Sequence, residues 1–143
     1  MAISQAVANS FKKEILEGIH DLESGGDVFK LGLYTSVATL SSATTSYTTS
    51  SEVAASGEYV AGGGVLQTQQ VSLATGGVAI VDFADLSFTG VTLTARGALI
   101  YNTTEAKKAV CVLDFGSDKT ATSGTFTIQF PAFNSSSAIL RIA

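Results

Sequence analysis

Residues suited to acid–base or nucleophilic chemistry are scarce in this sequence, which contains one histidine and one cysteine. A Ser-His-Asp or Cys-His arrangement would have to use His20. His20 lies near the end of a predicted helix, where a partly charged imidazole complements the helix dipole. Cys111 lies in an apolar run, as is typical of a buried, unreactive thiol. We therefore expect structural roles for both residues, no catalytic residues and no enzymatic activity.

Metal ligands are equally scarce. One cysteine and one histidine cannot form a zinc centre of the usual kind. The spacing of four aspartates matches no EF-hand calcium loop; these are Asp82, Asp85, Asp114 and Asp118. An Asp-Phe pair ends two predicted strands, where a carboxylate commonly accepts hydrogen bonds from turn N–H groups. Glu52 and Glu58 would be the remaining pair of acid–base carboxylates, and no pattern supports them. We expect no metal and no cofactor.

Three consecutive glycines, Gly62 to Gly64, are the one stretch that could approach a phosphate closely. A phosphate-binding loop would continue into Gly-Lys-Ser/Thr and a helix, and this sequence does neither. The glycines therefore predict a turn or bulge between strands.

The composition favours contact with proteins over contact with nucleic acid or membrane. The 143 residues carry a net charge of −4, with 14% charged and 45% hydrophobic residues. Nucleic-acid binding needs a basic patch, and the sequence offers only the pairs Lys12-Lys13 and Lys107-Lys108. No apolar run approaches the ~18 residues of a membrane span, and no secretory signal is expected. Few long charged side chains suit a surface that lies against other chains.

One amphipathic helix is predicted at the start of a single domain that spans residues 1–143. Apolar residues recur at helical spacing over residues 2–23; they are Ile3, Val7, Phe11, Ile15, Ile19 and Leu22. The glycines at 25 and 26 would end the helix, so residues 1–26 form the helical part. Its apolar side must cover either the protein's own sheet or a partner.

A β-rich body is predicted for residues 27–143. The candidate strands cover 29–34, 66–73, 78–83, a short segment at 88, 91–95 and 98–101 around an Arg96-Gly97 bulge, 110–115, 125–130 and 138–142. The 110–115 run is apolar on both sides, as in a strand covered on both faces. The predicted fold is mainly β: a β-sandwich or flattened barrel of about eight strands with one N-terminal helix.

Residues 36–51 are predicted to form a long surface loop or arm, since eleven of the sixteen are Ser or Thr. Such a segment can add an extended strand to a neighbour's sheet, and it should be mobile until it is bound. Together with the helix, this arm is expected to make most of the partner contacts. The candidate contact residues are Phe11, Ile15, Leu40, Thr44, Thr45, Tyr47 and Thr48.

Several segments taken together resemble small virion structural proteins of tailed bacteriophages. The resemblance covers most of the chain and is carried by AISQA (2–6), FKLGLYTS (29–36), ATL (38–40), GEYVAGG (57–63), RGALIYN (96–102) and KAVCVLDFG (108–116). It transfers no catalytic or ligand residues. It implies a capsid-associated part, namely a decoration (cement) protein.

The resemblance leads to an expected function. The chain would bind the head shell of a phage and stabilise contacts between capsomers. Its partners would be the major capsid protein or other virion proteins, and we also expect that it can form a homo-oligomer. It would be made in the bacterial host cytoplasm and reside in the virion. The alternative is a tail or head-fibre module that recognises host surface carbohydrate, although such sites favour aromatic residues and tryptophan is absent.

Overall fold

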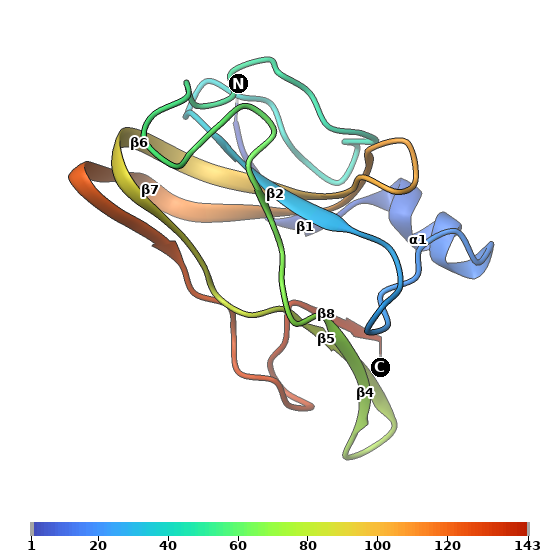
Figure 1. Cartoon of the computed structure of the whole chain (residues 1–143). Coiled ribbons are helices and arrows are strands. Elements are labelled where there is room, and N and C mark those ends of the chain that lie inside the picture. Colours follow the sequence, from blue (N-terminus) through green and yellow to red (C-terminus); the bar gives the residue numbers. More distant parts are fainter. Residues whose placement is uncertain (1, 143) are drawn as a thin grey trace.

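The computed structural model describes residues 2–142, which form a mainly β protein with two antiparallel sheets and one short helix (Figure 1). This architecture confirms the predicted fold class. The elements in chain order are β1 (Ala6–Val7), α1 (Asn9–Leu16), β2 (Phe29–Tyr34), β3 (Gly64–Val65), β4 (Gln70–Ala74), β5 (Val78–Asp82), β6 (Leu86–Asn102), β7 (Lys108–Ile128) and β8 (Leu140–Ile142).

The larger sheet is built around one long hairpin, β6–β7. Its five strands lie in the order β1-β7-β6-β2-β3. The predicted bulge at Arg96-Gly97 is confirmed, because the pairing of the two strands shifts between Ala95 and Gly97. As predicted, 91–95 and 98–101 belong to one strand, β6, which also includes the short segment predicted separately at 88. The segments predicted at 110–115 and 125–130 both belong to β7. Residues 116–124 join them, although their Gly, Ser, Thr and Asp content gives no strand signal.

Both faces of the larger sheet are covered around β2 and the adjoining halves of β6 and β7, which explains the near-continuous apolar runs there. On one face, the Phe29 ring lies 5.8 Å from the ring of Phe83. On the other face, the Tyr34 hydroxyl donates a hydrogen bond to the Thr48 carbonyl at 2.6 Å, so the 36–51 segment covers this side. The core of the molecule therefore lies on both sides of β2 and β6.

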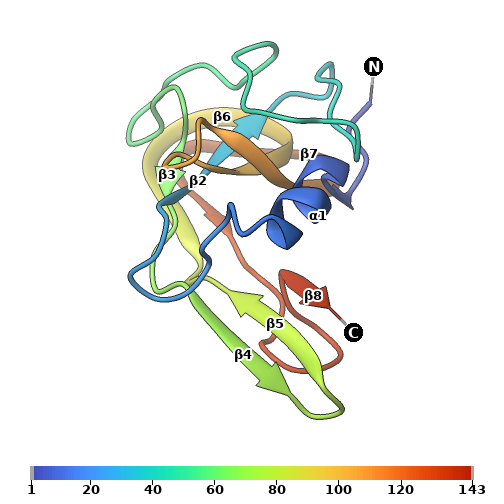
Figure 2. The same ribbon diagram turned by 90° about the vertical axis from the view of Figure 1, so that its right-hand side faces the viewer.

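The smaller sheet has three strands in the order β4-β5-β8. Figure 2 shows these strands extending away from the larger sheet and facing α1 across a gap between the ribbons. The strand predicted at 66–73 begins only at Gln70, and the strand predicted at 138–142 only at Leu140. Every residue of β4 except Ala74 is exposed, so this sheet is covered far less than the larger one.

The N-terminal helix is much shorter than predicted. Residues 2–23 do not form one helix, because Ala6–Val7 pairs with β7 and Ile3 pairs with Leu40. The helix begins at Asn9 and ends at Leu16, followed by Gly18 at φ +74°. A glycine in this left-handed conformation ends many helices. The predicted apolar side is nevertheless buried at Ile3 and Phe11; Ile3 reaches the core from extended backbone.

No helix in the part of the chain that the structure describes is long and apolar enough to cross a membrane.

Candidate protein-interaction surface

His20 is part of a buried structural cluster. Its side chain is fully buried, with Nε2 2.9 Å from a Glu14 carboxylate oxygen and Nδ1 3.0 Å from the amide nitrogen of Asn102. That amide also donates to Asp27, while its oxygen accepts the N–H of Thr104. Because the Asn102 nitrogen is a donor, Nδ1 of His20 accepts and Nε2–H donates to Glu14. The cluster joins the segment after α1 to the β6–β7 turn.

The other candidate chemical groups also have structural partners. Burial raises the pKa of the Cys111 thiol to about 12, so the thiol stays protonated at neutral pH. Asp114 accepts the N–H of Gly116 at 2.9 Å, and this bond, with the nearby Arg96, lowers its pKa. Desolvation raises the pKa of Asp82, the last residue of β5. Within residues 2–142, no three His, Cys, Asp or Glu side chains are grouped to hold a metal ion.

The 36–51 segment lies against the body of the protein. Leu40 is 1% exposed, and the ring of Tyr47 stacks on that of Tyr101 with centroids 4.7 Å apart. The amide of Tyr47 donates to the carbonyl of Lys107 at 2.9 Å. The segment forms the loop that was predicted, but in the free chain it is anchored by these contacts.

Glu52, directly after this segment, holds the segment to the glycine-rich turn. Its carboxylate accepts the hydroxyls of Tyr47 at 2.5 Å and Tyr59 at 2.7 Å, and the N–H of Gly62 at 2.7 Å. The glycines form a turn, as predicted, and this turn also lies very close to β2. A Cβ on Gly63 would lie 1.8 Å from the carbonyl oxygen of Leu31, so only glycine fits there. Glu52 is thus a structural carboxylate.

The seven predicted contact residues differ in how far they are buried. Phe11 and Leu40 lie in the chain's own core, with 4% and 1% of their surface exposed, so in this conformation neither has surface left for a partner. Four others are half-buried, and Thr45 is exposed; the half-buried four are Ile15, Thr44, Tyr47 and Thr48. Of the seven, Phe11 and Ile15 border the groove described next.

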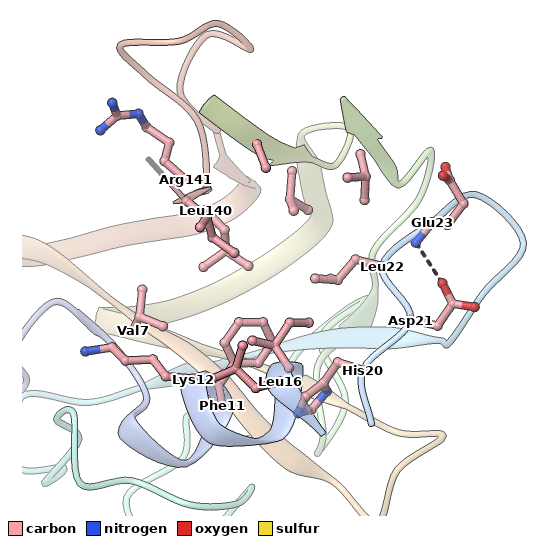
Figure 3. Close-up of a pocket in the computed structure, with 15 residues that line it drawn as sticks. Val7, Phe11, Lys12, Leu16, His20, Asp21, Leu22, Glu23, Leu140 and Arg141 are labelled. Carbon is pink, nitrogen blue, oxygen red and sulfur yellow. Dashed lines mark hydrogen bonds between the residues drawn. The ribbon is translucent and has the colours of Figure 1, made fainter. Parts of the chain in front are cut away.

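An apolar groove of about 610 Å³ runs between α1 and the smaller sheet (Figure 3). The helix side presents Lys12, Ile15 and Leu16, and the side chain of Leu16 is 89% exposed. Phe11 and Leu22 also line it. An exposed leucine at the mouth of an apolar groove marks a surface suited to protein contact.

The pairing of the strands shows which side chains form the sheet side of the groove. Val71, Val81 and Leu140 lie side by side across β4, β5 and β8. The next row is Leu73, Ala79 and Ile142, of which Leu73 is 74% and Ile142 60% exposed. Since side chains alternate along a strand, all six point to the same face. This face of the smaller sheet is entirely apolar, and its outer row is largely uncovered.

The groove has opposite charges at its two ends. Lys12 lies at one end, and Asp21 and Glu23 lie at the other (Figure 3). Arg141 stands between Leu140 and Ile142 in β8, so its side chain points to the opposite face of the sheet, where it donates to the Ser135 carbonyl. The ion pairs found within residues 2–142 involve other residues, so none of the three charges at the groove is neutralised by an ion pair inside the described chain. The carboxylates of Asp21 and Glu23 accept local backbone N–H groups.

The sequence analysis did not find this groove. Alternation over 71–73 and 79–81 was a visible signal for one face of a sheet. What the sequence could not supply was the pairing of β8 with β5, which brings Leu140 and Ile142 from a distant segment.

Comparisons of the chain with protein-family models, with curated proteins and with solved structures find no match.

Proposed function

We propose that this chain is a structural protein that binds other protein chains through the apolar groove between α1 and the smaller sheet. The observation that carries the proposal is the exposure of Leu16 and Ile142, which line this groove, and of Leu73, which lies in the same row of the sheet as Ile142. Removing apolar surface from water contributes about 25 cal/mol per Å², before the costs of association. A partner that covers these side chains would gain this free energy.

The resemblance to small phage virion proteins supplies the setting. In that setting, the chain is a decoration protein on the head shell and stabilises contacts between capsomers. The far ends of β6 and β7 suit such a role, because they expose threonines paired across the strands, with the hydroxyls of Thr94 and Thr120 2.9 Å apart. Short side chains lose little conformational entropy when a neighbouring subunit covers them.

The structure offers no comparable support for carbohydrate recognition. Sugar rings are commonly bound by stacking on exposed aromatic side chains. Within the described residues, every tyrosine and phenylalanine is buried or half-buried. The protein–protein proposal is therefore the one that the geometry supports best.

The proposal is tested in particles of the virus that encodes the chain. Quantitative mass spectrometry should find hundreds of copies per particle; a few to a few dozen copies would indicate a tail or fibre, and absence from particles would refute the proposal.

A second measurement tests the groove itself. Particles that lack the chain are incubated with purified protein carrying Leu16→Asp, or Val60→Asp as a matched control. Val60 is a 55% exposed apolar residue outside the groove. We expect Leu16→Asp to lower occupancy at least about tenfold, which is the loss expected at an interface centre, and Val60→Asp to leave it unchanged. Equal occupancy for both variants would contradict the role of the groove.

A further inference from the structure

The arrangement of charge around the groove indicates which chain occupies it. One cation, Lys12, lies at one end and two anions, Asp21 and Glu23, lie at the other, with apolar side chains between them. A partner must therefore offer an apolar centre, an anionic end and a cationic end in the reverse order. We infer that the occupant is a second copy of this chain, related to the first by a two-fold axis through the groove.

Two-fold symmetry satisfies this requirement with no other sequence. A two-fold axis that lies in the interface, at right angles to the length of the groove, brings the same surface of both copies together and exchanges the two ends. The Lys12 end of one copy then faces the Glu23 end of the other, and this happens twice. If each end of the groove faced the same end in the other copy, like charges would lie together and repel each other. The charge pattern thus selects one relative orientation.

The centre of the surface provides the contact that this orientation needs. Leu16 projects from the end of α1 with 89% of its surface exposed, and Ile142 of the sheet side is 60% exposed. In the two-fold arrangement, the Leu16 side chain of each copy enters the groove of the other and covers its sheet side. Lys12, Asp21 and Glu23 of each copy then surround an apolar centre, which is the usual layout of a specific interface.

This inference rests on the proposed function in so far as the groove is the binding surface. It names the partner, and it adds that the shell-bound unit is a symmetric dimer. The unpaired charges are what distinguish a copy of this chain from any other apolar partner.

The test uses two variants that reverse one end each. The first is Lys12→Glu. The second is Glu23→Lys with Asp21→Asn, which keeps an acceptor for the N–H of residue 23. Each variant alone places like charges together at both ends of the interface, whereas an equimolar mixture pairs opposite charges at both ends. Circular dichroism and thermal unfolding check that both variants fold.

Sedimentation velocity over a range of concentrations gives the readout. We expect the unmodified protein to dimerise, each variant alone to dimerise at least about tenfold more weakly, and the mixture to recover the dimer. A strictly monomeric unmodified protein overturns the inference. So does a closed trimer or larger ring, and so does a first variant that dimerises as well as the unmodified protein.

The occupancy experiment separates this inference from the proposed function. If the unmodified protein is monomeric but Leu16→Asp still lowers particle occupancy, the groove binds a different virion protein and only the inference fails. If the dimer forms as described but Leu16→Asp leaves occupancy unchanged, the inference stands and the proposed role of the groove fails.

Discussion

Glu52 shows how a single carboxylate can position two loops. It receives two tyrosine hydroxyls and a backbone N–H from two parts of the chain: Tyr47 lies in the 36–51 segment, and Tyr59 and Gly62 lie in the glycine-rich turn. Desolvation and the nearby Glu52 carboxylate raise the pKa of both tyrosines, so both hydroxyls remain donors at neutral pH. The 36–51 segment and the glycine-rich turn are therefore held by one acceptor group.

The first prediction concerns this residue. Glu52→Gln replaces one acceptor oxygen by a donor amide, so one of the three incoming donors loses its partner. We expect the free energy of unfolding to fall by about 1–3 kcal/mol, as measured by urea denaturation. The control is Glu58→Gln, because Glu58 is exposed and accepts the Thr89 N–H; its effect should stay within about 0.5–1 kcal/mol. Similar losses for both variants would contradict this role of Glu52.

The second prediction concerns Cys111. Its folded pKa is raised from 9.0 to about 12 by burial. Because the folded pKa is raised, the protonated thiol contributes to the free energy of unfolding fully below about pH 9. This contribution is lost as pH rises toward 12, because the unfolded chain releases the proton first. The raised pKa of Tyr101, about 12, acts in the same direction. We expect stability to fall over this range, and less steeply in Cys111→Ala than in the unmodified protein.

A thiol reagent gives an independent measurement on Cys111. At pH 8, iodoacetamide should alkylate the folded protein at least about a hundredfold more slowly than the chain in guanidinium chloride, because the thiolate is the reactive form and burial excludes the reagent. Comparable rates in the two states would show that Cys111 is accessible.

At the scale of elements, α1 has two apolar residues with opposite roles. Phe11 points into the core and is 4% exposed, whereas Leu16 points into the groove and is 89% exposed. We predict that Phe11→Ala lowers the free energy of unfolding by about 3–5 kcal/mol, and that Leu16→Ala changes it by less than about 0.5 kcal/mol. Chemical denaturation of the two variants tests this. A large loss for Leu16→Ala would mean that Leu16 stabilises the free chain.

The strands show how far the sequence determines the elements. Alternation predicted β2, the turn residues at 74–77 predicted the hairpin that leads into β5, and the Arg96-Gly97 irregularity was correctly placed within β6. These signals are local. The middle of β7 lacked them, because its Gly, Ser, Thr and Asp residues are exposed and form a strand only by pairing with β6.

The helix was overextended for a related reason. Ile3 and Val7 have helical spacing with Phe11, yet both lie in extended backbone. Their pairing with Leu40 and Cys111 depends on contacts between distant segments, which residue spacing cannot reveal. For the same reason, the helix side of the candidate site could be predicted from Phe11 and Ile15, while the sheet side could not.

At the scale of the whole molecule, the 36–51 segment decides how rigid the free protein is. Its amides at Leu40 and Tyr47 donate to the carbonyls of Ala2 and Lys107, so it is attached to two separate parts of the chain. We predict that these two amides exchange at least about tenfold more slowly than in the unfolded chain. Hydrogen–deuterium exchange of the free protein tests this. Exchange of the entire segment at the unfolded rate would show that it detaches, as the sequence alone suggested.

The layout of the β6–β7 hairpin has a consequence for the order of folding. Its turn joins Asn102 to Lys108, a loop that closes quickly, whereas β1 must find Cys111 and Val112 from the other end of the chain. Contacts between distant residues form more slowly, since more chain entropy is lost. The hairpin should therefore form early, and β1, with α1 attached, should dock late. Because α1 supplies one side of the groove, a partly folded chain has no complete groove, and only molecules that have finished folding present the surface that we propose for binding.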